Sequence, residues 1–329
     1  MAIEIGNINA DTSVKLGNTT IQSGYIGTNL FFGNQLLGVL DLYPTSVHHA
    51  YSLRKLKSSY TGKCLRIRRT TITPTVTTTT VDLSFDSNNT ISLNSAITYV
   101  SGTATTATNL GQFCASILNG YSNPDLVNTN QNIFVVTWFD QSGNNKNPTQ
   151  ATAGSQPKIV NVGNLETKDS KVAVRFTKAS STNLQIADTT SSTNNLSIYF
   201  VGAYVTTVTG NIGYATGLVR IYFPFSNGSN LYAGYGNTST AILLDSLNTN
   251  RKLYEFLAPS PLNSAVAQAW SNGVAKTTTT LLNSVNLSIQ LGTGATNYFD
   301  GYIQEVIAWQ SNANRIEKET NINQYWQVY

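Results

Sequence analysis

The chain has 329 residues, of which 11% are charged, and its formal net charge is +4. A chain of this length can form one large β domain with a small appendage, since all-β domains of roughly 200 to 250 residues are common as single units. The field of so small a charge is too weak to indicate a nucleic acid or an anionic membrane as partner. No stretch approaches membrane-spanning length, so we expect no membrane segment.

Residues 1–45 are predicted to form a small β-module before a main domain over residues 46–329. They are either a unit that joins this domain to a larger particle or an extra hairpin packed on the sandwich. Residues 13–21 and 24–33 have the pattern of short strands joined by glycine-containing turns. The amino terminus has neither a basic region nor a sustained apolar stretch, so we expect no secretory signal.

Two adjacent histidines, His48 and His49, follow Pro44 at the predicted domain boundary and are the only histidines of the chain. Adjacent residues of a strand point to opposite faces, so the pair could not readily share a metal. We therefore expect solvent-exposed linker histidines and no metal site.

A basic segment lies between Leu53 and Arg69, with no acidic residue between Asp41 and Asp82. One interpretation is contact with a nucleic acid or an anionic glycan. The favoured one is a half-buried strand with a charged outer face, because leucine and isoleucine alternate with arginines there. The cysteines Cys64 and Cys114 are expected as separately buried thiols.

Strands dominate the rest of the chain. Asn109 can cap a helix over residues 109–120, and the tail from Asn312 is predicted to be helical at first. The dipeptide Asn272-Gly273 predicts a tight type I′ turn between strands 265–270 and 274–280. Further strands are predicted at 133–139, 172–176, 196–205, 218–223, 241–244, 252–257, 287–291 and 298–309. Their spacing indicates an all-β, two-sheet sandwich.

The run Trp138-Phe139-Asp140-Gln141-Ser142-Gly143-Asn144 ends a hydrophobic strand with a polar turn. In a binding interpretation, Trp138 or Phe139 stacks on a sugar while Asp140, Gln141 and Asn144 bond its hydroxyls. In a structural interpretation, Asp140 and Ser142 satisfy backbone donors and Trp138 is core. The structural interpretation is favoured, because a buried strand is expected there.

Three blocks carry a family resemblance, and they occur in the order 50–69, 138–151 and 299–307. They resemble the catalytic domain of arabinofuranosidase B and, more broadly, concanavalin A-like, laminin-G-like lectin domains. The resemblance implies a concanavalin A-like two-sheet jelly-roll sandwich over residues 46–329, with one or two short helices.

The same resemblance implies where a hydrolase would carry its carboxylates. The segment nearest to the family's nucleophile, residues 226–234, contains no Asp or Glu, and neither does the segment nearest to its acid, residues 291–297. Glycoside hydrolysis usually needs two carboxyl groups, so we expect no catalytic residues and no enzyme of that mechanism. Asn227, Asn230 and Asn297 of these segments are candidate glycan-binding residues. Asp300 and Glu305 are expected to be solvated or capping, and no cofactor is indicated.

These blocks also resemble bacteriophage structural proteins, which implies a head fibre, tail fibre or capsid decoration protein of the virion. Other virion proteins would bind the N-terminal module, and cell-surface glycans would bind the lectin-like domain, without catalysis. Lysis would release such a particle from the host cytoplasm. A homo-oligomer is expected, with a trimer as a form that fibre proteins commonly take. The alternatives are an arabinofuranosidase-type glycoside hydrolase and a purely architectural capsid protein.

Overall fold

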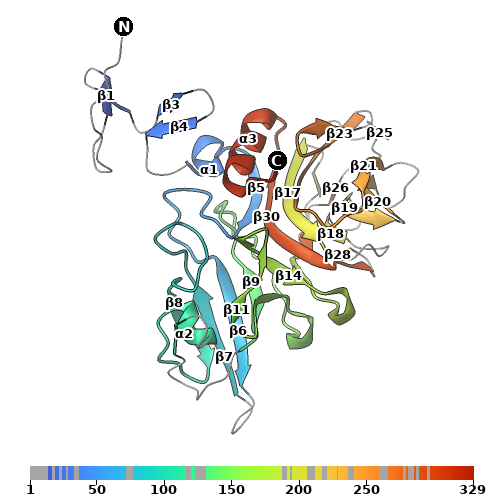
Figure 1. The fold of residues 1–329 in the computed structure, drawn as a ribbon. Coiled ribbons are helices and arrows are strands. Elements are labelled where there is room, and N and C mark those ends of the chain that lie inside the picture. Colours follow the sequence, from blue (N-terminus) through green and yellow to red (C-terminus); the bar gives the residue numbers. More distant parts are fainter. Residues whose placement is uncertain are drawn as a thin grey trace.

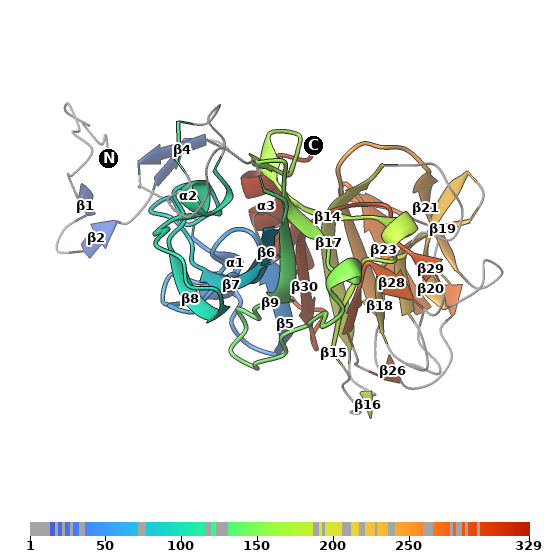
Figure 2. The same cartoon turned by 90° about the horizontal axis from the view of Figure 1, so that it is seen from below.

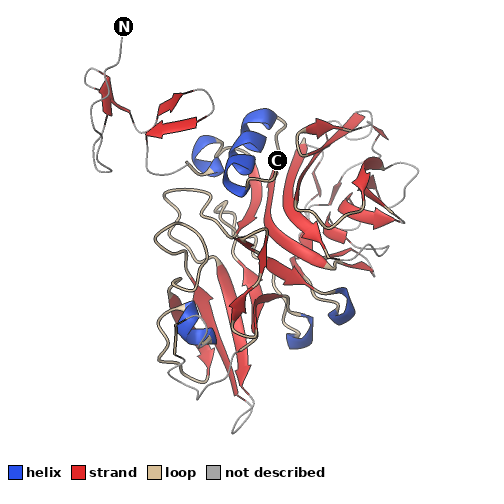
Figure 3. Cartoon of the chain, in the orientation of Figure 1, coloured by secondary structure: helices blue, strands red, loops and turns tan. Residues whose placement is uncertain are grey.

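The computed structural model describes residues 14–16, 19–21, 24–26, 29–32, 37–71, 77–115, 120–122, 131–186, 191–192, 195–205, 212–216, 221–227, 229–235, 241–258, 266–276, 279–280, 285–286, 289–294 and 297–329. These residues form two large antiparallel sheets with three α-helices (Figures 1 and 3), so the prediction of an all-β sandwich is confirmed. The helices of the described residues are α1 (Val39–Leu42), α2 (Leu110–Cys114) and α3 (Arg315–Trp326).

The larger sheet has 14 strands, which extend in sequence from residue 47 to residue 309. Strand β30 (Gly301–Trp309) is its centre, because β17 (Leu196–Tyr204) pairs along one edge and both β14 (Val174–Phe176) and β5 (Val47–Ser52) pair along the other. Beyond β17 lie β22 (Lys252–Ala258), β23 (Val266–Ser271), β24 (Val274–Ala275) and β25 (Thr279–Thr280). Beyond β14 lie β10 (Lys158–Asn161), β11 (Asn164–Leu165), β9 (Ile133–Trp138), β6 (Leu65–Thr71), β7 (Thr77–Leu83) and β8 (Ile97–Gly102).

The smaller sheet has six strands and lies beside the β17–β30 half of the larger one (Figure 2). Its order is β15 (Leu184–Ile186), β27 (Ile289–Leu291), β18 (Ile212–Thr216), β19 (Ile221–Asn227), β20 (Asn230–Tyr235) and β21 (Ile242–Ser246). Short ribbons join the loops: β12 (Thr167–Lys168) with β13 (Lys171–Val172), β16 (Ser191–Ser192) with β26 (Val285–Asn286), and β28 (Thr293–Gly294) with β29 (Asn297–Tyr298).

Aromatic residues fill the core, because a sandwich must bury one apolar face of each sheet. The ring centroid of Phe299 lies 5.0 Å from that of Tyr204 and 6.2 Å from that of Phe176, and all three side chains are buried. One contiguous cluster of buried side chains includes residues of both sheets, such as Phe200 of β17 and Leu231 of β20.

Local signals in the sequence place several elements. Asn109 caps α2, since its side-chain oxygen accepts a hydrogen bond from the Gln112 amide at 2.8 Å. The helix is described only to Cys114, and residues 116–119 of its predicted range lie outside the described residues. Asn272 and Gly273 have φ angles of 49° and 74°, so the predicted type I′ turn between β23 and β24 is confirmed.

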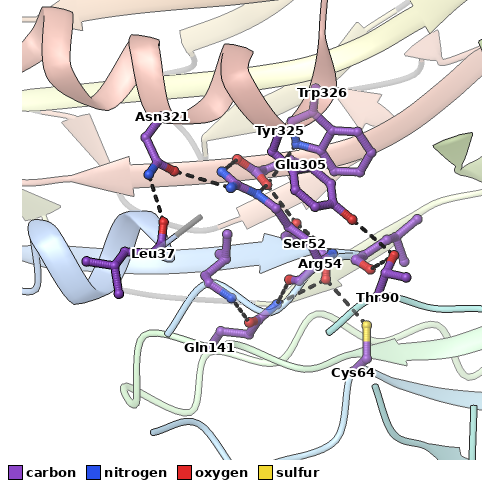
Figure 4. A network of polar contacts seen from close by, with 12 residues as sticks. Leu37, Ser52, Arg54, Cys64, Thr90, Gln141, Glu305, Asn321, Tyr325 and Trp326 are labelled. Carbon is purple, nitrogen blue, oxygen red and sulfur yellow. Dashed lines mark hydrogen bonds and ion pairs between the residues drawn. The ribbon is translucent and has the colours of Figure 1, made fainter. Parts of the chain in front are cut away.

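The tail is helical at first, as predicted, and forms α3. This helix covers the larger sheet, and a buried polar network lies beneath it (Figure 4). The Arg54 guanidinium donates to both oxygens of Glu305, at 2.8 and 3.1 Å, and also to the Asn321 side-chain oxygen at 3.2 Å. Ser52 and the Trp326 indole donate to the same carboxylate, at 2.7 and 2.9 Å. The expectation of a solvated or capping Glu305 is therefore wrong, because Glu305 is fully buried and neutralised by Arg54.

The basic segment follows the favoured interpretation in part. Leu65 and Ile67 are buried while Arg66 and Arg68 are half-buried on the opposite face of β6. Arg69, however, is buried and donates to the Phe113 carbonyl at 2.8 Å, because α2 covers its side of the strand. Cys64 and Cys114 are free and buried, which confirms the prediction of two separate thiols.

The N-terminal segment forms two hairpins, which confirms the short strands predicted there. Strand β1 (Val14–Leu16) pairs with β2 (Thr19–Ile21), and β3 (Gly24–Ile26) pairs with β4 (Asn29–Phe32).

Candidate functional site

The Trp138–Asn144 turn, the first predicted sugar site, is built into the protein interior. Asp140 is buried, and one of its carboxylate oxygens accepts from the amides of Ala50 and Ser142 at 2.8 and 2.9 Å. Its other oxygen accepts from the Ser142 hydroxyl at 2.7 Å and the Lys146 amide at 3.2 Å. Burial raises the pKa of Asp140 and these hydrogen bonds oppose the rise. The carboxylate therefore organises the turn and the start of β5.

The side chains of Gln141 and Trp138, next to Asp140, are also buried within the protein. Gln141 is buried and its amide donates to the carbonyls of Ser52 and Arg54, both at 3.0 Å, while its oxygen accepts from the Leu56 amide at 2.8 Å. Trp138 is fully buried in the core. This placement supports the structural interpretation and argues against direct sugar contacts by Trp138, Asp140 and Gln141.

Asn144 is exposed, but its side chain also bonds to β5. Its side-chain amide donates to the carbonyls of Val47 and His48, at 2.7 and 3.2 Å. Its contacts therefore fasten the turn to the first residues of β5.

The histidine pair of β5 does not match its expectation, because His48 and His49 are both buried. Their Nδ1 atoms lie 2.8 Å apart, and Lys146 Nζ lies 2.7 Å from His48 Nε2. The His49 ring stacks between Tyr51 and Tyr214, at centroid distances of 5.1 and 5.7 Å. Burial first, then the charges of His48 and Lys146, lower the pKa of His49 well below its usual range. The prediction of exposed linker histidines is wrong, since the strand that contains them pairs with β30 inside the fold.

Asn227 and Asn230, the second predicted group, lie side by side at the end of the β19–β20 hairpin. They are cross-strand partners, and Phe225 and Tyr232 are the next partners along the same face. The rings of Phe225 and Tyr232 stack at a centroid distance of 5.6 Å, and the Asn230 amide donates to the Tyr232 hydroxyl at 3.4 Å. Asn227 is exposed, while Asn230 and Tyr232 are half-buried.

This face of the smaller sheet is separate from the main core. Phe225 and Tyr232 pack with Ala215 and Ala241 in a cluster of their own, whereas Leu231 belongs to the main core. Leu243, the cross-strand partner of Tyr232, is 46% exposed. We call Phe225, Asn227, Asn230, Tyr232 and Leu243 the β19–β21 face.

Three residues of this face were missed in the sequence: Phe225, Tyr232 and Leu243. Alternation could have found two of them, because each lies two residues from a predicted asparagine and therefore on the same side of its strand. The third residue could not be found this way, since its position opposite Tyr232 depends on strand pairing.

Asn297 is exposed on β29, whose partner strand β28 contacts β18 of the smaller sheet. The structure thus places Asn227, Asn230 and Asn297 around the smaller sheet, whereas the Trp138–Asn144 turn follows β9 of the larger one. The two predicted groups belong to different parts of the sandwich.

Among the described residues, no cluster of three or more His, Cys, Asp or Glu side chains is arranged to hold a metal ion. Within the same residues, no helix is both long and apolar enough to cross a membrane.

Comparison with known proteins gives structural similarity only. No protein-family model matches the chain. No curated protein matches it either. An arabinofuranosidase complexed with arabinofuranosyl-α-1,2-xylobiose is 15% identical, with a TM-score of 0.48. The match covers 87% of this chain and 64% of the arabinofuranosidase chain. An α-L-arabinofuranosidase with a cyclic sulfate inhibitor is also 15% identical, with a TM-score of 0.47 over 87% of this chain and 65% of its own.

Domain 4 of an extracellular arabinanase from Geobacillus stearothermophilus, in complex with arabinotriose, is 15% identical. Its TM-score is 0.38 over 56% of this chain and 91% of that domain. The chain spans slightly less than two thirds of the length of the two arabinofuranosidases. Similarity at this level does not identify a function.

Proposed function

We propose that this protein binds glycans without catalysis, through the β19–β21 face of a concanavalin A-like lectin domain. The observation that supports this proposal is the half-buried Tyr232 ring, which stacks on the buried Phe225 and has the amides of Asn227 and Asn230 beside it. A sugar presents apolar C–H groups on its ring face and hydroxyls at its edge. An aromatic surface next to side-chain amides matches both parts.

The chemistry of this face suits an uncharged sugar. Asn227, Asn230 and Tyr232 each offer a donor and an acceptor, as the hydroxyls of a neutral saccharide require. The exposed Leu243 extends the apolar surface next to Tyr232. A shallow sheet face with few polar groups is expected to bind weakly and to gain strength through several copies on one particle.

The proposal excludes hydrolysis by the arabinofuranosidase mechanism. The segments 226–234 and 291–297, which resemble that family's catalytic segments, contain no carboxylate. A two-carboxylate mechanism therefore lacks its acid and its nucleophile at those positions.

Titration of the full chain with a panel of oligosaccharides, including arabinan fragments, tests the site. We expect Tyr232→Ala to lower the affinity about tenfold, because truncating an aromatic residue that dominates a binding surface costs more than about 1 kcal/mol. Tyr99→Ala, which removes an exposed tyrosine from β8 of the larger sheet, is the matched control. Unchanged affinity in Tyr232→Ala would refute the site, and sugar release from arabinan would favour the hydrolase alternative.

We further propose that the protein belongs to a bacteriophage virion, attached through residues 1–45 and displaying the lectin-like domain as a homo-oligomer. The support is the resemblance of blocks 50–69 and 138–151 to phage structural proteins. Immunogold electron microscopy of a phage lysate should label heads or tails. Unlabelled particles, with the protein present in the same lysate, would overturn this role and leave the glycan site to be judged by titration.

A further inference from the structure

A row of three cationic and two aromatic side chains crosses five neighbouring strands of the larger sheet. Arg68 of β6 is the cross-strand partner of Phe134, which is the partner of Lys158. Lys158 pairs with Arg175 of β14, and Arg175 pairs with Tyr302 of β30. All five side chains are half-buried, so the row lies on a face that solvent reaches.

The cations of this row lie against the rings. The Arg68 guanidinium carbon is 4.9 Å from the Phe134 ring centroid, and Lys158 Nζ is 6.0 Å from the same centroid. Arg175 lies over Tyr302 at 5.3 Å. Such contacts hold the charged groups in place but leave their charge uncompensated.

The cations differ in their counter-ions. Arg175 forms an ion pair with Asp300 at 2.6 Å, and Arg66, next to the row, forms one with Asp82 at 2.7 Å. Arg68 and Lys158 form no ion pair with any of the described residues.

Arg68 and Lys158 instead use neutral acceptors. Arg68 donates to the side-chain oxygens of Gln156, at 2.7 Å, and Thr70, and to the Ala153 carbonyl at 3.3 Å. Lys158 donates to the Asn161 side-chain oxygen at 3.1 Å. An arginine has five N–H donors and a lysine three, so both cations keep donors for a ligand.

This arrangement is unfavourable for the isolated protein. Lys158 and Arg175 are like charges placed directly opposite each other, which destabilises a sheet. Burial lowers the pKa of Arg68, because no carboxylate compensates its desolvation. Local conflicts of this kind are expected at functional sites, where a ligand supplies the missing charge.

We propose that Arg68, Phe134 and Lys158 form a binding site for an anionic group of an acidic polysaccharide. A carboxylate or sulfate between the two cations would accept charge-assisted hydrogen bonds from both, and the ring of Phe134 would support the sugar. This site lies on the larger sheet, so it is distinct from the β19–β21 face and does not rest on the function proposed for it.

The neighbouring acids favour a sparsely charged polymer over a nucleic acid. Asp82, Asp300 and Glu166 flank the row. Burial raises the pKa of Glu166, and the charges of Arg175 and Lys158 oppose that rise. Duplex DNA carries one charge per about 1.7 Å, so further phosphates would meet these acids. The strands of Arg68 and Lys158 lie on either side of the strand of Phe134, and both cations lie over its ring, so one anionic group can lie between them. A polymer with widely spaced charges places that group there without bringing further anions against the acids.

Binding of the full chain to hyaluronan, which carries a carboxylate on every second sugar, tests the proposal. Dextran serves as the neutral polymer and duplex DNA as the dense polyanion. We expect hyaluronan to bind more tightly than either and its affinity to fall with added salt. Arg68→Gln with Lys158→Gln should lower that affinity about tenfold or more, since two charge-assisted hydrogen bonds are lost.

Lys57→Gln is the matched control, because it removes one positive charge from a different part of the surface. Thermal melting checks the fold of each variant, and Lys158→Glu alone serves if Arg68→Gln does not fold. Unchanged hyaluronan binding in a folded Lys158→Glu variant would overturn the proposal, as would equal binding of dextran. Tighter binding of DNA would assign the row to a nucleic acid. Tyr232→Ala should leave hyaluronan binding unchanged, which separates this site from the β19–β21 face.

Discussion

Glu255 should make the stability of this protein fall as pH rises towards 8. It lies on β22 beneath α3 with only 2% of its surface exposed, and its carboxylate is 2.8 Å from Arg315. Arg315 also binds Glu319 at 2.8 Å, so one guanidinium serves two carboxyl groups. Burial first, and then the charge of Glu319, raise the pKa of Glu255 to about 8.

The direction of this pH dependence follows from the number of protons that the folded and unfolded states bind. In the unfolded chain a glutamate has a pKa of about 4.3, so between roughly pH 4.3 and 8 the folded state holds a proton that the unfolded state has lost. The stabilisation is complete below the unfolded pKa and is lost as pH rises through the folded pKa. Each pH unit costs about 1.4 kcal/mol well below the folded pKa and about half of that at the folded pKa, so the loss between pH 6.5 and 8 is about 1 to 2 kcal/mol.

Other groups titrate near this window, so the test compares two proteins. The pKa of His49 is lowered, which gives the opposite slope below about pH 6.5. The pKa of Lys318 is lowered to about 8 by burial, which gives the opposite slope above that pH. Glu255→Gln leaves both groups in place and removes only the carboxyl.

Urea unfolding at intervals from pH 6.5 to 8 measures the effect. The wild-type free energy of unfolding should fall about 1 to 2 kcal/mol more than that of Glu255→Gln. The other charged groups around the site, Arg315, Glu317, Glu319 and Tyr329, are shared by both proteins. Parallel pH profiles for the two proteins would refute the assignment of a protonated Glu255.

Three further outcomes are expected. Glu305→Ala should lower the free energy of unfolding by about 3 to 5 kcal/mol, because it leaves the Arg54 charge buried without its partner; a loss below about 1 kcal/mol in chemical denaturation would contradict this. Gly273→Ala should lower the melting temperature, since φ is 74° there and an added Cβ would lie 2.7 Å from a Glu319 oxygen. Cys64 and Cys114 should react with a thiol reagent only after unfolding, because burial raises the pKa of both thiols; rapid labelling of the native protein would show the opposite.

The amino-acid sequence was sufficient where the deciding interaction is local. Asn109 caps its helix with its own side chain, and Asn272-Gly273 turns the chain through two positive φ angles. The alternation of Leu65 and Ile67 with arginines set which face of β6 is buried. Strand positions followed for the same reason, since alternation and turn residues act within a few positions of the chain.

Pairing between strands that are far apart in the sequence determines the features that local patterns did not indicate. His48 and His49 are buried because β5 pairs with β30, more than two hundred residues later in the chain, and nothing local indicates it. Glu305 looks like a surface carboxylate until Arg54 is placed against it by the same pairing.

The strands, the tight turns and the two short helical segments could be predicted from the amino-acid sequence, because they depend on neighbours within a turn or a strand. The fold determines whether Cys64 and Cys114 pair and which polar side chains are free to meet a ligand. Asp140 and Gln141 bond to the backbone around a turn, whereas Tyr232, Leu243 and Arg68 lie at the surface. The reason is that a polar group is satisfied by whichever partner the fold brings to it, and most of these partners are distant in sequence.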